Sequence, residues 1–315
     1  MALAKSFVAI AALATIAALA TLAACSPKSE PAAPPKPAPT AAAPAPAPVA
    51  FKIGAFDAAA LFDGTIKVAN DGKTFGIGRP PSEVAAVLKA AGRPDDSLDL
   101  SLQPLLVRGE GKVLLFDTGA ARVDFAQGGK LNDSLRAAGV EPAQVTDIFI
   151  SHSHDDHLGG LTTADGALAF PNATIHISAP EWAAMRAEPR RAALVKAMTP
   201  KVAAFQPGAV LLPGLVSAVE VKGHTPGHSA YEIASGQERL LYIGDAAHHF
   251  VISVAKPDWT IAYDGDAPAA QASRRALLQK AADQNLRLYA VHFPYPGLGR
   301  VKAQGDGFVW VPEQP

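Results

Sequence analysis

The most informative segment of the chain is Ser151-His152-Ser153-His154-Asp155-Asp156-His157-Leu158-Gly159-Gly160. Three histidines and two aspartates fall within its positions 152–157. The apolar run 145–150 comes directly before them and predicts a buried strand, which places these side chains at a strand end. Neutral imidazole and carboxylate groups bind zinc and similar divalent ions, whereas a crowd of them makes a poor core. The segment therefore predicts a metal site at the end of a strand.

The pattern His-x-His-x-Asp-His at positions 152–157 resembles the signature of the metallo-β-lactamase-fold hydrolases. The resemblance implies an αββα sandwich, in which two mixed β-sheets lie face to face, helices cover their outer sides and the site lies at one edge of the sheets. Composition and periodicity alone indicate only an α/β (α+β) fold class.

Three more candidate residues follow predicted strands further along the chain. His224 lies in a Gly-His-Thr-Pro-Gly-His turn, and Asp245 and His292 follow the apolar runs that begin at Leu240 and Leu288. The resemblance implies seven metal ligands from four strand ends: His152, His154, Asp156, His157, His224, Asp245 and His292. Asp245 is expected to bridge two metals, since each of its oxygens can serve one cation and offset the repulsion between them.

The resemblance also implies the cofactors and the chemistry. The ligands are expected to hold two divalent metal ions per chain, zinc in the first place, although manganese, iron and cobalt accept the same histidine and aspartate ligands. Two such cations lower the pKa of a shared water, and the resulting hydroxide attacks an electrophilic carbonyl or phosphoryl centre. The expected catalytic residues are Asp156, which orients the water or passes its proton to the leaving group, the bridging Asp245, and His248.

Several neighbouring residues have roles that the sequence leaves open. Lactonases of this superfamily often carry a tyrosine three residues after the bridging aspartate; here His248 stands at that offset, either as a hydrogen-bond donor to the substrate or as pocket lining. Asp117, in an Asp-Thr-Gly sequence, either orients a metal ligand or caps its own turn. His228 is expected to support the site or the fold, His176 to be structural, and His249 to face away. Three aromatic residues are explained equally well as pocket walls or as core: Phe250, Trp259 and Phe293.

The N-terminus predicts export. An apolar stretch follows one early cation, and Leu22-Ala23-Ala24-Cys25 looks like the lipobox of bacterial lipoproteins. Residues 1–24 are therefore expected to be a signal peptide, and the lipidated Cys25 a membrane anchor; a retained anchor helix is the competing interpretation. The serine after the cysteine is typical of lipoproteins on the periplasmic side of the outer membrane. Cys25 is the only cysteine, so internal disulfides are excluded, and the Pro/Ala-rich remainder of 25–50 is expected to be a linker.

Residues 51–315 are expected to form one hydrolase domain, with hairpins within 51–68 and helices at 82–91, 131–138 and 179–198. The formal net charge is −1 and no block rich in Lys and Arg stands out, which argues against a nucleic-acid partner. The expected partner is a small-molecule substrate. The oligomeric state stays open, a homodimer included.

The C-terminal part narrows the expected reaction. Segments 244–249, 292–300 and 305–312 look like the branch that contains methyl parathion hydrolase and related lactonases. This resemblance covers most of 51–312 and implies a hydrolase of a lactone, an ester or an organophosphate. Other classes stay open: an iron-dependent oxidoreductase of the same fold, similar to sulfur dioxygenases, a β-lactam hydrolase, and a non-catalytic surface binding protein. The intact ligand set disfavours the last.

Overall fold

The computed structural model describes residues 45–313. The expected signal peptide, Cys25 and residues 26–44 lie outside the described residues. The fold begins with β1 (Val49–Ile53), whose first two residues fall inside the segment 25–50 that was expected to be linker. Between residues 45 and 313, no helix combines the length and the apolar character that a membrane crossing requires.

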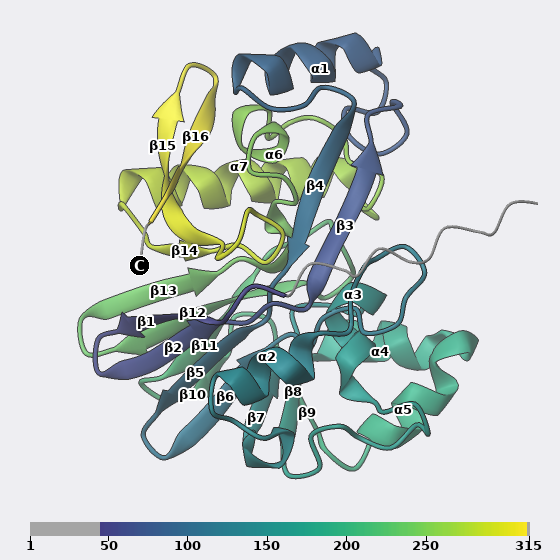
Figure 1. Ribbon diagram of the computed structural model, residues 1–315, viewed down its shortest axis with the longest axis vertical. Coiled ribbons are helices and arrows are strands. Elements are labelled where there is room, and N and C mark those ends of the chain that lie inside the picture. The colour runs from purple at the N-terminus through teal and green to yellow at the C-terminus, as the bar shows by residue number, and fades with distance from the viewer. Residues whose placement is uncertain (1–44, 314–315) are drawn as a thin grey trace, which may run out of the picture. The chain divides into compact units, whose positions relative to one another are not determined.

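Two mixed β-sheets of seven strands each lie in the middle of the fold (Figure 1). In spatial order, the first sheet contains β1, β2 (Phe56–Ala60), β5 (Leu105–Gly109), β6 (Lys112–Phe116), β7 (Asp147–Phe149), β8 (Thr174–Ser178) and β9 (Val202–Phe205). The second contains β10 (Val210–Leu212), β11 (Val216–Glu220), β12 (Ser229–Ser235), β13 (Glu238–Tyr242), β14 (Leu288–Tyr289), β15 (Leu298–Gln304) and β16 (Gly307–Pro312). The pairs from β6 to β9 are parallel, as is the pair β13 and β14. Loops after such strands gather at their carboxyl ends, where ligands commonly bind.

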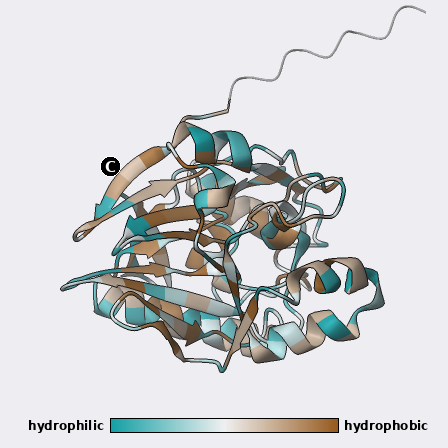
Figure 2. Ribbon diagram, turned by 90° about the horizontal axis from the view of Figure 1, so that it is seen from below, coloured by the Kyte–Doolittle hydropathy of each residue, from teal (hydrophilic) through white to brown (hydrophobic). Residues whose placement is uncertain are grey.

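Helices cover the outer faces of both sheets, and Figure 2 shows hydrophobic residues concentrated along the strands. The helices that pack on the first sheet are α2 (Leu131–Ala137), α4 (Ala179–Ala187) and α5 (Ala192–Met198), and those on the second are α6 (Ile252–Ala255) and α7 (Ala267–Asp283). Met185 of α4 and Leu278 of α7 are buried in these two outer layers. The order helix, sheet, sheet, helix confirms the expected αββα sandwich.

The layer between the two sheets is rich in aromatic side chains. Phe116 and Phe149 of the first sheet stack with ring centroids 4.9 Å apart, and Tyr242 and Tyr289 of the second stack at 5.8 Å. All four are fully buried, together with Tyr231. Each such ring removes a large apolar area from water, while a tyrosine keeps a hydroxyl for a polar partner. Tyr242 uses its hydroxyl at the edge of this layer, as described below.

A small two-stranded sheet lies beside the sandwich. In it β3 (Gly64–Ala69) pairs with β4 (Ser97–Leu102), and α1 (Pro81–Ala90) lies between them in the chain. The hairpin expected within 51–68 is confirmed for β1 and β2, which turn at Gly54. β3 instead pairs across a long connection, because its apolar face packs with α1 against the loops of the second sheet rather than against β2.

The helix expected at 179–198 is wrong as a single element. α4 ends at Ala187, and Pro189 begins the 3-10 turn η3 (Pro189–Arg191) before α5 starts. Proline has no N–H to donate, and its ring clashes with the preceding turn, so the first helix cannot continue through it.

The sequence also failed to predict the start of α1 and the whole of α7. α1 begins at Pro81, after Pro80, and not with Ser82 as its cap. α7, which is 17 residues long, was not predicted, because its apolar stripe is narrow, although its alanine, arginine and glutamine residues favour a helix. Asp266 starts α7 by accepting a hydrogen bond from the N–H of Ala269 (3.1 Å).

Candidate metal centre

Loops from both sheets bring the seven expected ligand residues together. His152 and the short helix α3 (Asp155–Leu158) follow β7, His224 follows β11, Asp245 follows β13, and His292 lies three residues beyond β14 rather than within it. Their donor atoms form two groups, and within each group all atoms lie within 4.8 Å of one another: His152, His154, His224 and Asp245 in the first, and Asp156, His157 and His292 in the second. We refer to these seven residues as the His/Asp cluster.

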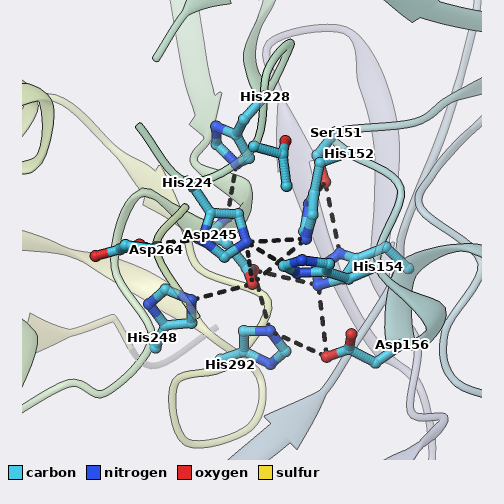
Figure 3. Close-up of polar contacts among 12 residues, drawn as sticks. Ser151, His152, His154, Asp156, His224, His228, Asp245, His248, Asp264 and His292 are labelled. Carbon is cyan, nitrogen blue, oxygen red and sulfur yellow. Dashed lines mark hydrogen bonds and ion pairs between the residues drawn. The ribbon is translucent and has the colours of Figure 1, made fainter. Parts of the chain in front are cut away.

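The carboxylate of Asp245 lies between the two groups, and the surrounding histidines point toward it (Figure 3). Its Oδ2 atom is 3.3 Å from His224 Nε2 and 3.6 Å from His152 Nε2. Its Oδ1 atom is 3.0 Å from His292 Nε2 and 3.2 Å from His157 Nε2. Each oxygen therefore faces one group, which is the arrangement that a bridging carboxylate requires.

The polar atoms of the cluster are not satisfied by protein partners alone. His157 Nε2 and Asp245 Oδ1 are buried, and none of their short contacts with the described residues has the geometry of a hydrogen bond. His224 Nε2 lies 3.1 Å from both His152 Nε2 and His154 Nδ1, and one N–H can serve only one of these contacts. Buried polar atoms without partners are rare and costly. Cations among these nitrogen and oxygen donors would satisfy them together, so the residues fit divalent metal ions.

Burial and neighbouring charges give two histidines and the central carboxylate of the cluster the protonation states that metal binding needs. Burial, reinforced by the neighbouring histidines, holds the pKa of His152 well below its ordinary value and lowers the pKa of His154 to about 4. Burial alone would raise the pKa of Asp245, but the histidines around it hold that pKa well below its usual range. The rings of His152 and His154 are therefore neutral with a free lone pair, and the carboxylate is ionised. In His157, His224 and His292, neighbouring carboxylates outweigh burial and raise the pKa, so these rings would release a proton when a metal binds.

Asp117 lies between the cluster and the aromatic layer and contacts both. Its Oδ2 accepts hydrogen bonds from His157 Nδ1 (2.7 Å), the Ser151 hydroxyl (2.6 Å) and the Tyr242 hydroxyl (2.7 Å). Its Oδ1 accepts one from the N–H of Ser151 (2.7 Å). Of the two roles open for Asp117, the structure supports the orientation of a cluster histidine, because the carboxylate fixes the ring of His157.

Other partners orient the remaining rings. His292 Nδ1 donates to the carbonyl of Ser101 (2.9 Å), and His224 Nδ1 contacts Asp264 Oδ1 (3.1 Å). Asp264 in turn pairs with the fully buried Arg274 of α7 at 2.6 Å. Sequence reasoning missed Asp264 and Arg274, because neither lies in a local motif and only the folded chain brings them to His224.

The histidines outside the cluster have the expected placements. His228 Nε2 accepts a hydrogen bond from the N–H of Asp245 (2.9 Å), so it supports the backbone that carries the carboxylate. His176 pairs with Asp147 at 2.9 Å, away from the cluster. His249 turns away, and its Nδ1 accepts from the N–H of Val251 (3.3 Å).

His248 faces the cluster. Its Nε2 atom lies 3.2 Å from Asp245 Oδ2, and neither ring nitrogen has a hydrogen-bond partner among the described residues. Burial lowers its pKa, which keeps the ring neutral with one N–H to donate. Of the three aromatic residues weighed as pocket walls, Trp259 and Phe293 are buried in the core and Phe250 packs against it, so the core interpretation holds.

A cavity of about 620 Å³ opens over the cluster. The cluster residues that line it are His154, Asp156, Asp245 and His292, and His248 lies beside them. Its apolar wall comes from residues that the sequence did not single out: Ile66, Val68, Leu100, Phe125 and Tyr263. Phe125 and Tyr263 expose 54% and 37% of their surface, so they stand at the mouth of the cavity. They belong to loops, where a periodic pattern gives no signal.

Comparisons with known proteins agree with this geometry. The family model described as the metallo-beta-lactamase superfamily matches residues 104–292. The chain is 34% identical to AidC, a dizinc quorum-quenching lactonase, with a TM-score of 0.78 over 85% of this chain and 98% of that one. It is 27% identical to the hydrolase AbOPH of the beta lactamase superfamily, with a TM-score of 0.76 over the same shares. The comparison with curated proteins found no match.

A likeness in fold alone extends further. A probable metal-dependent hydrolase from Staphylococcus aureus is 20% identical, with a TM-score of 0.71 over 84% of this chain and 99% of that one. The matched family segment contains the whole His/Asp cluster, and the sandwich places its residues around one carboxylate. The chain therefore belongs to the metallo-beta-lactamase superfamily and is a hydrolase with a metal-binding His/Asp cluster.

Proposed function

We propose that the protein is a dinuclear metal-dependent hydrolase that cleaves a lactone, an ester or an organophosphate. The observation that carries the proposal is the position of Asp245, whose two oxygens face two separate groups of ligand atoms. The likeness to a dizinc quorum-quenching lactonase and to the hydrolase AbOPH supports it.

The cluster would hold two ions, with zinc proposed first. His152, His154 and His224 would bind one ion, and Asp156, His157 and His292 the other, with Asp245 between them. When bound, two such cations supply the Lewis acidity that turns water into a nucleophile near neutral pH and polarises the substrate oxygen. Manganese, iron and cobalt are alternatives, because the same nitrogen and oxygen donors accept them.

Two residues of the chain then act on the substrate directly. Asp156 Oδ2 lies 3.5 Å from His292 Nε2 and borders the cavity, where it can hold a proton for the leaving group. His248 borders the same cavity with a neutral ring, and its N–H can donate a hydrogen bond to the substrate oxygen that gains negative charge. Ile66 and Leu100 form an apolar wall beside these polar groups, which suits a substrate with an apolar arm next to its electrophilic centre.

Metal analysis of the purified protein, run beside hydrolysis assays, tests this function. The substrates are an N-acyl homoserine lactone, a nitrophenyl ester and methyl parathion. We expect about two zinc or manganese ions per chain and turnover of at least one substrate. A single iron per chain with no hydrolysis would move the protein to the oxidoreductases of the same fold.

We also propose that Cys25 carries a lipid and that the hydrolase domain works on the periplasmic side of the outer membrane. The sequence Leu22-Ala23-Ala24-Cys25 supports the lipidation. Cells fed labelled palmitate should incorporate the label into the wild-type protein and not into Cys25→Ala. Equal labelling of the two proteins would contradict the anchor.

A further inference from the structure

Glu181, in the first turn of α4, has no exposed surface and accepts four hydrogen bonds. Its Oε1 accepts from the N–H (2.8 Å) and the hydroxyl (2.5 Å) of Ser153. Its Oε2 accepts from the Thr225 hydroxyl (2.8 Å) and the N–H of Gly227 (2.8 Å). All four donors are neutral N–H or hydroxyl groups, so hydrogen bonds, and not an ion pair, hold the carboxylate to its neighbours.

These donors belong to the two loops that carry one half of the cluster. Ser153 stands between His152 and His154 after a strand of the first sheet, and Thr225 directly follows His224 after a strand of the second. One carboxylate therefore ties together the loops of all three histidines in the first ligand group. The histidines of the other group have different supports, since His157 is fixed by Asp117 and His292 by a backbone carbonyl.

The start of α4 is itself fixed against the same turn. The Ser178 hydroxyl donates to the carbonyl of Gly227 (2.6 Å) and accepts from the N–H of Glu181 (3.3 Å). A Cβ atom on Gly227 would lie 2.2 Å from Ser178 Oγ and 2.3 Å from the Glu181 nitrogen, so only glycine allows this approach. The carboxylate is thus held at one position, from which it sets the separation of the two loops.

We propose that Glu181 is a positioning residue, which sets the spacing of His152, His154 and His224 and thereby controls metal affinity at that half of the centre. The inference rests on the proposed two-metal function. A glutamine at this position keeps the shape of the side chain but replaces one acceptor oxygen with a donor NH₂ group. One pair of loop donors then faces another donor, and the loops separate.

Titration of the full, metal-stripped chain with Co²⁺ alone, followed by visible absorption, tests the proposal. We expect two binding steps in the wild type and, in Glu181→Gln, a loss of about 10–100-fold in affinity at one step, because partners of this kind change metal affinity by such factors. The other step should keep its wild-type affinity. Glu188→Gln is the matched control: Glu188 lies at the other end of α4, is half-exposed and should leave both steps unchanged.

Two further variants keep the proposal testable if Glu181→Gln does not fold. Ser153→Ala and Thr225→Val each remove one hydroxyl donor and should weaken the same step by a smaller factor. Equal weakening of both steps, or no change in either, would overturn the positioning role. A wild-type chain with a single step contradicts the two-metal function and the inference together, whereas two wild-type steps with an unaffected Glu181→Gln contradict the inference alone.

Discussion

Asp245 contacts both halves of the cluster through its carboxylate. Because each of its oxygens faces a different pair of histidines, Asp245→Ala should remove bound metal and hydrolysis together. Metal content and kcat/KM of the purified variant check this, and circular dichroism controls for folding. Turnover near the wild-type rate with normal metal content would contradict the bridging role.

Substitution of His248 distinguishes the two roles that are open to this residue, catalysis and lining of the cavity. If its N–H stabilises charge that develops on the substrate, His248→Ala should lower kcat by about 100-fold, as removal of one such donor does, with normal metal content. His249→Gln is the control, because His249 is equally buried but faces away from the cluster. A change in KM with kcat intact would assign His248 to the cavity lining.

At this scale the sequence revealed the residues that lie in local motifs. His152, His224 and their neighbours follow apolar runs within tight, glycine-containing turns, so the chemistry and the position are visible together. Asp264, Arg274 and Glu181 carry no such signal. Each acquires its role through a contact with a distant segment, and a lone aspartate, arginine or glutamate in a sequence is most often a solvated surface residue.

Among the elements, α7 supports the site through a buried ion pair. Arg274 is 1% exposed, pairs with Asp264 and donates to the carbonyl of Ala246 (3.0 Å), next to Asp245. Arg274→Met should cost about 3–5 kcal/mol of unfolding free energy, because it leaves a buried charge unpaired. Urea unfolding measures this loss. The double variant Asp264→Asn with Arg274→Met should be milder than Arg274→Met alone, and equal losses would show that the charge is not the cause.

Strands β6, β7 and β8 are joined by a second polar network, in which Asp147 and His176 are buried and Lys112 is half-exposed. Asp147 contacts Lys112 at 3.0 Å and His176 at 2.9 Å. Burial would raise the pKa of Asp147, but hydrogen bonds from His176, Thr146 and Lys112 outweigh it and lower the pKa to about 2. A lowered pKa means that the ionised carboxylate stabilises the fold above the unfolded pKa, and that this stability is lost as the pH falls through the folded value.

Asp147→Asn should therefore destabilise the protein by about 2 kcal/mol at pH 7, and the difference from the wild type should shrink below about pH 4. Urea unfolding of the metal-free proteins at pH 7 and pH 3 measures both values, without a contribution from metal release. A difference that stays constant between the two pH values would show that packing, and not the charge, is responsible.

The strands that precede the cluster were predictable, because short apolar runs bounded by glycine and polar turns have few other interpretations. The pairing of β3 with β4 was not, since α1 separates them in the chain and neither strand encodes its partner. The break at Pro189 was available in the sequence, because a proline in a helical stretch marks an end. For α7, the helix-forming residues and the cap Asp266 were available in the sequence, and only the apolar periodicity was weak.

For the whole molecule, bound metal should act as a link between the two sheets. Four cluster residues lie on loops of the first sheet and three on loops of the second, so binding requires the docked sandwich. Metal at about a thousand times its Kd adds about 4 kcal/mol. Chelation should then lower the Tm by roughly 10 °C, as calorimetry can show. Asp245→Ala is the control and should not respond to the chelator; an equal shift in that variant would point to another binding site.

The layered architecture came from the resemblance of one motif, whereas composition and periodicity indicated only α/β. The physical reason is that alternating strands and helices are compatible with many sheet orders. What distinguishes this order is the closure of two sheets over an aromatic layer from both halves of the chain, with Phe116 and Phe149 on one side and Tyr242 and Tyr289 on the other. Such long-range complementarity has no local trace.

Because the cluster is divided between the two sheets, its residues are synthesised at different times. All strands of the first sheet end by Phe205. The cluster residues that the second sheet supplies come later in the chain, from His224 to His292. A chain that grows from its N-terminus presents His152 and its neighbours long before Asp245 exists, and the earlier part tends to fold first. The centre is therefore among the last features to be completed, and a ribosome-bound chain that stops before β13 would carry five of its seven residues without the carboxylate that joins them.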